Sequence, residues 1–170
     1  MRIRRGVAAD APALAEIAAR TFAETFGAFN TPENLAAHLA NAYGVTQQAR
    51  ELADTSTVTL LGEDSDALIA YAQVRNVAPL PCVTHAAPIH LQRFYVARAA
   101  HGRGVAQTMM TAVRDVAREW AGRHIWLAVW ERNDRALAFY AKCGFVPAGE
   151  TVFYVGDDRQ IDRVLVAPVD

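Results

Sequence analysis

The chain has 170 residues, of which 52% are hydrophobic and 21% charged. This length and composition indicate one globular domain rather than a disordered or multidomain protein. The formal net charge is −1, so no basic field is available to hold nucleic acid or an anionic membrane. No apolar run reaches the roughly 18 residues of a transmembrane segment, and no signal peptide is evident. We therefore expect one soluble, unprocessed domain over residues 1–170 with neither nucleic-acid nor membrane partners.

Two residue types that often bind metals show no ligand pattern. Cys82 and Cys143 lie far apart and outside any CxxC pair, so the sequence indicates neither a disulfide framework nor a zinc site. His85 and His90 have no ligand-like spacing and no carboxylate companion. We expect no metal site, and a reducing compartment such as the cytoplasm.

The first third of the chain predicts a strand followed by three helices. Asp10 can cap the first helix, and Thr31 with Pro32 is a cap and first-turn signal for the second. Apolar residues recur at three- and four-residue spacing after each cap. The predicted elements are a strand at 2–7 and helices from near 11 to near 27, from 31 to 44 and over 46–53.

The middle of the chain predicts a hairpin and a long loop. Residues 57–61 and 68–75 are β-branched or apolar runs that flank a turn-rich cluster, so we expect them to pair antiparallel. Residues 76–88 hold three prolines and no charged residue. This segment is long enough to suspect a role in binding or association, although an inert loop fits the sequence equally well.

The last third predicts a crossover of strand, helix and strand. Such a unit should be right-handed with parallel strands, and Asn133 can cap a further helix that ends at Gly144. A terminal hairpin follows across a turn at 156–159. The predicted elements are strands at 89–96, 124–130, 151–155 and 161–166, with helices at 105–121 and 133–144.

A glycine-containing turn between a strand and a helix is suited to an anion. Gly102 and Gly104 permit close backbone approach, and the first amides of the next helix are free donors at its positive end. Arg98, His101 and Arg103 add cationic or titratable side chains. The turn lacks both the GxGxxG spacing of a dinucleotide fold and the Lys of a Walker loop. These features favour a phosphate or pyrophosphate ligand and disfavour a dinucleotide-dependent oxidoreductase.

Two segments carry a family resemblance. His101-Gly102-Arg103-Gly104-Val105-Ala106 resembles the acyl-CoA pyrophosphate loop of the GCN5-related N-acetyltransferases (GNAT), with His101 departing from the usual first residue. The stretch from Asn133 through Tyr140 to Phe145 resembles the second family segment. Over nearly the whole chain the resemblance is closest to PaiA-type spermidine and spermine acetyltransferases, and it is carried by 21–26, 30–35, 125–133 and 153–157.

The resemblance implies a fold and a set of coenzyme contacts. The fold would be α/β (α+β), with a mixed, mostly antiparallel sheet of about seven strands flanked by helices and a splayed parallel strand pair holding acyl-CoA. Acetyl-CoA would be the co-substrate, without a metal. The implied contacts are Phe94, Tyr95 and Val96 with the pantetheine and thioester, His101, Gly102, Arg103, Gly104, Val105 and Ala106 with the phosphates, and Asn133 with the pantetheine arm.

Tyr140 is the candidate general acid. It lies about two helical turns beyond Asn133 and so on the same face, and the resemblance places it beside the coenzyme sulfur. A phenol with a pKa near 10 stays protonated at neutral pH and can donate to a thiolate whose own pKa is near 8.5. A core aromatic role beside Phe139 is the alternative.

The general base and the acceptor site are less defined. Gln92 stands where many relatives carry a glutamate and cannot act as a base. Glu24, Glu33 or a water chain could substitute, and a polyamine would call for several carboxylates. Each is also compatible with a solvated surface charge. The candidates for binding an acceptor are Glu24, Glu33, Glu150, Asp157 and Asp158.

The sequence thus predicts an N-acetyltransferase that transfers acetyl from acetyl-CoA directly to a primary amine. A polyamine such as spermidine or spermine is favoured by the resemblance alone, and a protein N-terminus or another small amine stays open. A non-catalytic acyl-CoA-binding regulatory protein is the alternative of another class. Trp126 and Trp130 share one strand face and fit either core or acceptor pocket. A homodimer is compatible with the sequence, which does not decide it.

Overall fold

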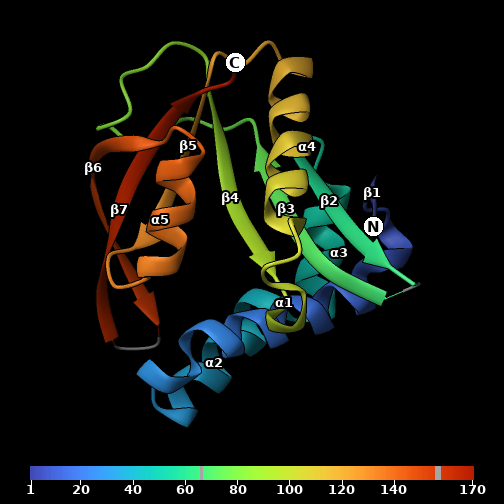
Figure 1. The fold of residues 1–170 in the computed structure, drawn as a ribbon. Coiled ribbons are helices and arrows are strands. Elements are labelled where there is room, and N and C mark those ends of the chain that lie inside the picture. The colour runs from blue at the N-terminus through green and yellow to red at the C-terminus, as the bar shows by residue number, and fades with distance from the viewer. Residues whose placement is uncertain (66, 156–157) are drawn as a thin grey trace.

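Seven strands form one mixed sheet, in the order β1-β2-β3-β4-β5-β7-β6, in the computed structural model, which describes residues 1–65, 67–155 and 158–170 (Figure 1). The strands are β1 (Arg2–Arg5), β2 (Thr57–Asp64), β3 (Ala67–Arg75), β4 (Pro88–Val96), β5 (His124–Trp130), β6 (Val146–Val155) and β7 (Asp158–Pro168). The helices are α1 (Ala11–Phe26), α2 (Pro32–Tyr43), α3 (Val45–Ala53), α4 (Val105–Glu119) and α5 (Asp134–Lys142). The predicted mixed sheet flanked by helices is confirmed.

Helices cover both faces of the sheet, because neighbouring strand residues point to opposite sides. Leu60 packs with Met109 of α4 in the largest core cluster, whereas the adjacent Leu61 packs with Leu14 and Phe22 of α1 in a second cluster. α4 and α5 therefore cover one face, and α1 with its neighbouring helices covers the other (Figure 1).

The parallel strand pair separates after a short contact. β4 and β5 pair only over Pro88–His90 and His124–Trp126, although β4 continues to Val96 beside β3. Gln92 is the extra residue of a bulge, since Gln73 pairs with Arg93 and Val74 with Leu91. A bulge bends its strand, and the sheet is open between β4 and β5 beyond this point. The predicted crossover with parallel strands is confirmed.

Of the predicted caps of α1 and α2, the second is correct and the first is wrong. The Thr31 Oγ1 accepts a hydrogen bond from the Asn34 amide at 3.2 Å and caps α2 as expected. Asp10 makes no capping bond to α1. Its carboxylate instead accepts from the Val7 amide at 2.8 Å and pairs with Arg4 at 2.7 Å. Asp10 therefore binds Arg4 and the turn before α1 instead of capping the helix.

The terminal hairpin is longer than the sequence predicts. β6 begins at Val146 rather than Thr151, and β7 runs from Asp158 to Pro168. Pairing passes through an irregularity between Pro147 and Gly149, which hides the strand from a test of strict alternation. Asp158 and Arg159, predicted in the turn, belong to β7, and residues 156 and 157 lie outside the described residues.

The proline-bearing loop at 76–87 packs on the sheet. Val83 is buried against Trp126, Val164 and Val166 in a third cluster, with Leu80 and Cys82 partly buried beside it. This contact gives the loop a structural role. No helix among the described residues is both long and apolar enough to cross a membrane.

Candidate active site

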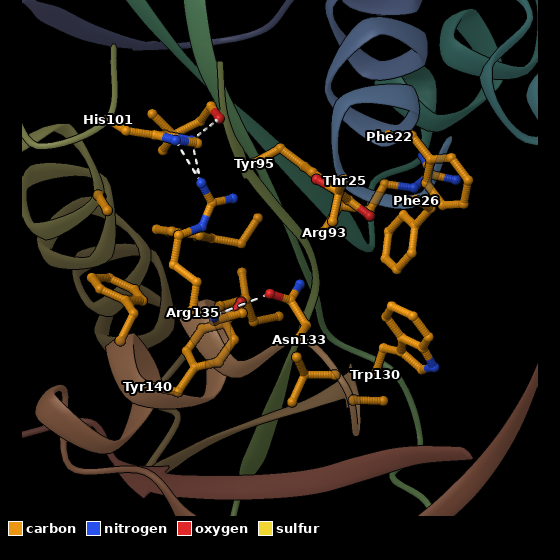
Figure 2. A pocket seen from close by; sticks show the side chains of 18 of the residues that line it. Phe22, Thr25, Phe26, Arg93, Tyr95, His101, Trp130, Asn133, Arg135 and Tyr140 are labelled. Carbon is orange, nitrogen blue, oxygen red and sulfur yellow. Dashed lines mark hydrogen bonds between the residues drawn. The ribbon is translucent and has the colours of Figure 1, made fainter. Parts of the chain in front are cut away.

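A cavity of about 710 Å³ occupies the opening between β4 and β5. Figure 2 shows its two sides: His101, Arg135 and Tyr140 lie on one, and Phe22, Phe26, Arg93 and Trp130 on the other, with Asn133 between them. The cavity therefore connects the glycine-containing turn before α4 (residues 101–106, the anion-binding turn) with a chamber lined by aromatic residues that include Phe22, Phe26 and Trp130 (the aromatic chamber).

The turn before α4 has the geometry of an anion site. Gly102 and Gly104 have φ of +75° and +77°, a left-handed region that disfavours other residues. A Cβ built on either glycine would meet nothing within 4 Å. Gly104 begins α4 without a side-chain cap, so the first amides of the helix remain available to an anionic ligand. These features fit the phosphates of acyl-CoA, as the resemblance implies.

His101 and Arg135 meet across this end of the cavity. Arg135 Nη1 donates to His101 Nδ1 at 2.5 Å, and His101 Nε2 donates to the Val96 carbonyl oxygen at 2.9 Å (Figure 2). Both side chains line the cavity. The guanidinium of Arg135 is therefore well placed to pair with a phosphate, and sequence reasoning missed it because it lies on α5, far along the chain from the turn.

The side chain of Arg103 does not line the cavity, and the contact predicted between Arg103 and the phosphates stays a prediction. It is half exposed and pairs with Asp64 at 2.6 Å. Gly102, Gly104, Val105 and Ala106 do line the cavity with His101. The part of the turn that lines the cavity is thus mainly backbone, and the side chain of Arg103 ties the turn to the end of β2.

The three predicted β4 residues, Phe94, Tyr95 and Val96, line the cavity. They pair with β3 on one side, and on the β5 side they lie beyond the last parallel pair. Their free strand edge offers backbone groups to an extended ligand such as pantetheine. Gln92 also lines the cavity, and its amide offers hydrogen bonds but no basic group.

Tyr140 lies on the same side of the cavity as His101 and Arg135 (Figure 2). It is 7% exposed and has edge contacts with Phe94, Phe139 and Phe145, with ring centroids 5.4–6.3 Å apart. Burial raises the pKa of its phenol well above the usual value, because the charged form loses solvation. Tyr140 therefore holds its proton at neutral pH and is a donor to whatever occupies the cavity.

Asn133 occupies the junction of the two sides and caps α5. Its Oδ1 accepts from the Ala136 amide at 3.2 Å, as the sequence predicts, and the residue lines the cavity. We expect Asn133→Ala to lower the free energy of unfolding by about 1 kcal/mol through loss of the cap. Asn133→Asp retains a capping oxygen and should stay near wild type. Urea denaturation of the three proteins checks this, and equal loss in both variants would contradict a capping role.

The two tryptophans of β5 have different surroundings. Trp130 lines the cavity, with its ring centroid 5.7 Å from Phe26 and 4.9 Å from Phe29. Trp126 is stacked on His90 at 3.8 Å and packs in the third cluster. Trp130 is thus a pocket residue and Trp126 a core residue.

The structure does not bring the predicted acceptor carboxylates Glu24 and Glu33 into the cavity. Glu24 accepts from the Arg98 amide at 2.9 Å and so ties α1 to the anion-binding turn. Glu33 is exposed in the first turn of α2.

Glu150 and Asp158 also lie outside the cavity lining. Glu150 is 3.8 Å from Arg163, and Asp158 accepts from Gln160 at 2.7 Å. Asp157 lies outside the described residues.

Asp162 is the acidic residue that sequence reasoning missed. It lines the cavity, and burial raises the pKa of its carboxyl to about 6. Gln160, Asp162, Val164 and Val166 alternate along β7 and are all buried. Polar residues at the inward positions of an alternating strand were the sequence pattern that could have identified Asp162 as a candidate site residue.

The comparisons with a family model, with related sequences and with a solved structure all match acetyltransferases. The model of the acetyltransferase (GNAT) family matches residues 13–145. An uncharacterized N-acetyltransferase in the pepI 3′ region of Lactobacillus delbrueckii subsp. lactis is 30% identical over 163 residues, which cover 92% of this chain and 90% of the relative. Streptothricin acetyltransferase of Streptomyces lavendulae is 29% identical over 116 residues, or 68% of this chain and 58% of that protein. The crystal structure of PaiA N-acetyltransferase from Thermoplasma acidophilum in complex with coenzyme A is similar at a TM-score of 0.80, with 16% identity and 98% of both chains covered.

Proposed function

The chain belongs to the acetyltransferase (GNAT) family and is an acetyl-CoA-dependent N-acetyltransferase, and we propose that it transfers the acetyl group directly to a primary amine inside the cavity beside β4. The observation that supports this most is the continuity of that cavity. It joins the uncapped start of α4, the protonated Tyr140 and an aromatic chamber. A coenzyme arm and an amine can therefore meet without a covalent enzyme intermediate.

We assign the steps of the transfer to particular groups. The amides that open α4, together with His101 and Arg135, hold the phosphates, while the free edge of β4 at Phe94–Val96 positions the acyl arm. Bound acetyl-CoA supplies the thioester that is to be cleaved. Tyr140 donates a proton to the departing sulfur, so that the coenzyme leaves as a neutral thiol.

The identity of the amine is open to a direct test. A polyamine is the acceptor that the sequence resemblance implies, but Asp162 carries the only carboxylate among the described residues that line the cavity. Several carboxylates would be expected for several ammonium groups. A protein N-terminus and other small amines therefore stand beside spermidine and spermine as candidates.

Thiol release from acetyl-CoA tests the proposal. The purified protein is assayed against spermidine, spermine, small monoamines, amino acids and N-terminal peptides, and the acetylated product is identified by mass spectrometry. Turnover with any primary amine supports the proposal, and the preferred amine fixes the acceptor class. Tight acetyl-CoA binding without turnover on any amine would contradict it.

We also propose a reducing, cytoplasmic location, which is supported by the free thiols of Cys82 and Cys143. The homodimer stays a prediction, and sedimentation equilibrium of the purified protein tests it.

A further inference from the structure

Two polar side chains on β7 lie buried in the cavity wall with unmet hydrogen-bonding capacity. Gln160 and Asp162 are 6% and 9% exposed and both line the cavity. The Gln160 Oε1 and the Asp162 Oδ1 are buried and have no hydrogen-bond partner among the described residues. Buried polar groups are normally paired, and a buried carboxylate without a partner is costly. Both atoms belong to residues of the cavity wall, where a bound ligand would supply the missing partner.

The charged neighbours of Asp162 do not supply its counter-ion. Arg93 lines the same cavity, but its guanidinium is held by Glu51 at 2.5 Å and by Gln73 at 2.7 Å. His38 lines the cavity from α2, and burial lowers the pKa of its ring. The other ionisable groups on β5, β6 and β7, and directly after β5, include His124, Glu131, Glu150, Tyr154, Asp158, Arg159 and Arg163. None of these forms a hydrogen bond or ion pair with Asp162 among the described residues, and burial is the only cause of the raised pKa of its carboxyl.

The surroundings of Asp162 are apolar and aromatic. Asp162 pairs with Trp130 across the β5–β7 ladder, so the two side chains lie side by side on one face of the sheet. Figure 2 shows the rings of Phe22, Phe26 and Trp130 turned toward one another on this side of the cavity. The aromatic residues that line this chamber are Phe22, Phe26, His38, Tyr43, Trp130 and Phe153.

We propose that Asp162 binds the ammonium group of the acceptor and accepts its proton, and that the aromatic chamber receives an apolar or aromatic group beside that single amine. This inference rests on the proposed acetyl transfer and specifies its acceptor. A cation supplies the missing partner of the carboxylate, and aromatic faces favour both a nearby ammonium and an apolar body. A long polycation would carry further ammonium groups, for which the described lining offers no second carboxylate.

The proton balance assigns complementary roles to Asp162 and Tyr140. Asp162 takes one proton from the ammonium and later passes it to water, which leaves a neutral amine with a free electron pair. As the C–N bond forms and the C–S bond breaks, Tyr140 gives its proton to the sulfur. The nitrogen then releases a second proton, which restores Tyr140. The sum is one amide, one thiol and one proton delivered to solvent.

Ligand binding provides a test that does not need turnover. Thermal denaturation at pH 8 is followed with 2-phenylethylamine, with the uncharged 2-phenylethanol and with spermidine, each in the presence of coenzyme A. We expect 2-phenylethylamine to raise the melting temperature of wild type and not of Asp162→Asn, and 2-phenylethanol to have little effect on either. Equal stabilisation of both proteins by the amine would overturn the role of Asp162, and a larger shift with spermidine would overturn the acceptor class.

Kinetics and stability provide readouts that a merely structural residue would not give. We expect Asp162→Asn to lower kcat/KM for the amine by about 100-fold or more with coenzyme A affinity unchanged. It should also remove an inflection near pH 6 from the wild-type profile. The folded protein binds this proton more tightly than the unfolded chain, so wild type loses stability as pH rises through about 6. Asp162→Asn should therefore melt higher than wild type at pH 8, with the gain shrinking toward pH 4.

Asp115→Asn is the matched control, because Asp115 is an exposed carboxylate on α4 that pairs with Arg118. It should change none of these readouts. Unchanged amine kinetics in Asp162→Asn, while wild type is active, would overturn this inference alone. Absence of wild-type turnover with every amine would contradict the proposed function, and the thermal shifts would still decide whether Asp162 binds an ammonium.

Discussion

Replacing Tyr140 with phenylalanine should lower kcat for acetyl transfer by about 100-fold or more, the usual contribution of a positioned general acid. Phenylalanine keeps the ring contacts with Phe94, Phe139 and Phe145 and removes only the hydroxyl. Because burial raises the pKa of Tyr140, the wild-type hydroxyl stays protonated through neutral pH. Steady-state kinetics at saturating amine, with the coenzyme A dissociation constant measured by calorimetry, checks this expectation.

Tyr154→Phe is the control for the loss of a tyrosine hydroxyl. Tyr154 is 56% exposed on β6 and does not line the cavity, so this variant should retain wild-type kcat. If Tyr140→Phe kept full activity, the thiolate would have to obtain its proton from water or another group. If it lost coenzyme A affinity in proportion to its rate, Tyr140 would be a binding residue instead.

Replacing Gly104 with aspartate should weaken acetyl-CoA binding by about 100-fold. The new side chain would extend into the open space where a Cβ at this position meets no atom. The repulsion between a carboxylate and a phosphate charge about 4 Å away reaches up to roughly 4 kcal/mol at an effective dielectric constant near 20. Aspartate tolerates positive φ better than most residues and suits a helix N-terminus, so the fold should survive.

Gly104→Asn is the matched control, since asparagine has nearly the same shape and the same tolerance of positive φ. Calorimetric titration with coenzyme A should show a much smaller loss for asparagine than for aspartate, and the difference should shrink as salt is added. Equal losses in both variants would indicate steric exclusion and not charge. Full affinity in both would mean that the phosphates bind elsewhere.

The features that the sequence predicts correctly depend on local spacing. Thr31 caps α2 and Asn133 caps α5, because a cap requires only a suitable residue a few positions before the helix amides. Gly102 and Gly104 adopt positive φ, which their residue type allows. The place of Tyr140 on the cavity side of α5 follows from its two-turn spacing from Asn133.

The features that the sequence missed depend on partners distant in the chain. Arg103 forms an ion pair with Asp64, and Arg135 donates a hydrogen bond to His101. Neither interaction can be predicted from the loop sequence alone. Glu24 is occupied by the amide of Arg98. The burial of Asp162 depends on the position of β7 between β5 and β6, and the alternation along β7 was the only indication of it in the sequence.

Direct transfer between two bound substrates is the central claim, and initial-rate kinetics with both substrates varied tests it most directly. Acetyl-CoA is varied at several fixed concentrations of the preferred amine. The account predicts reciprocal plots that intersect, because both substrates must occupy the cavity before the acetyl group moves. Parallel plots, together with an acetylated protein detected by mass spectrometry in the absence of amine, would show a covalent intermediate and contradict the claim.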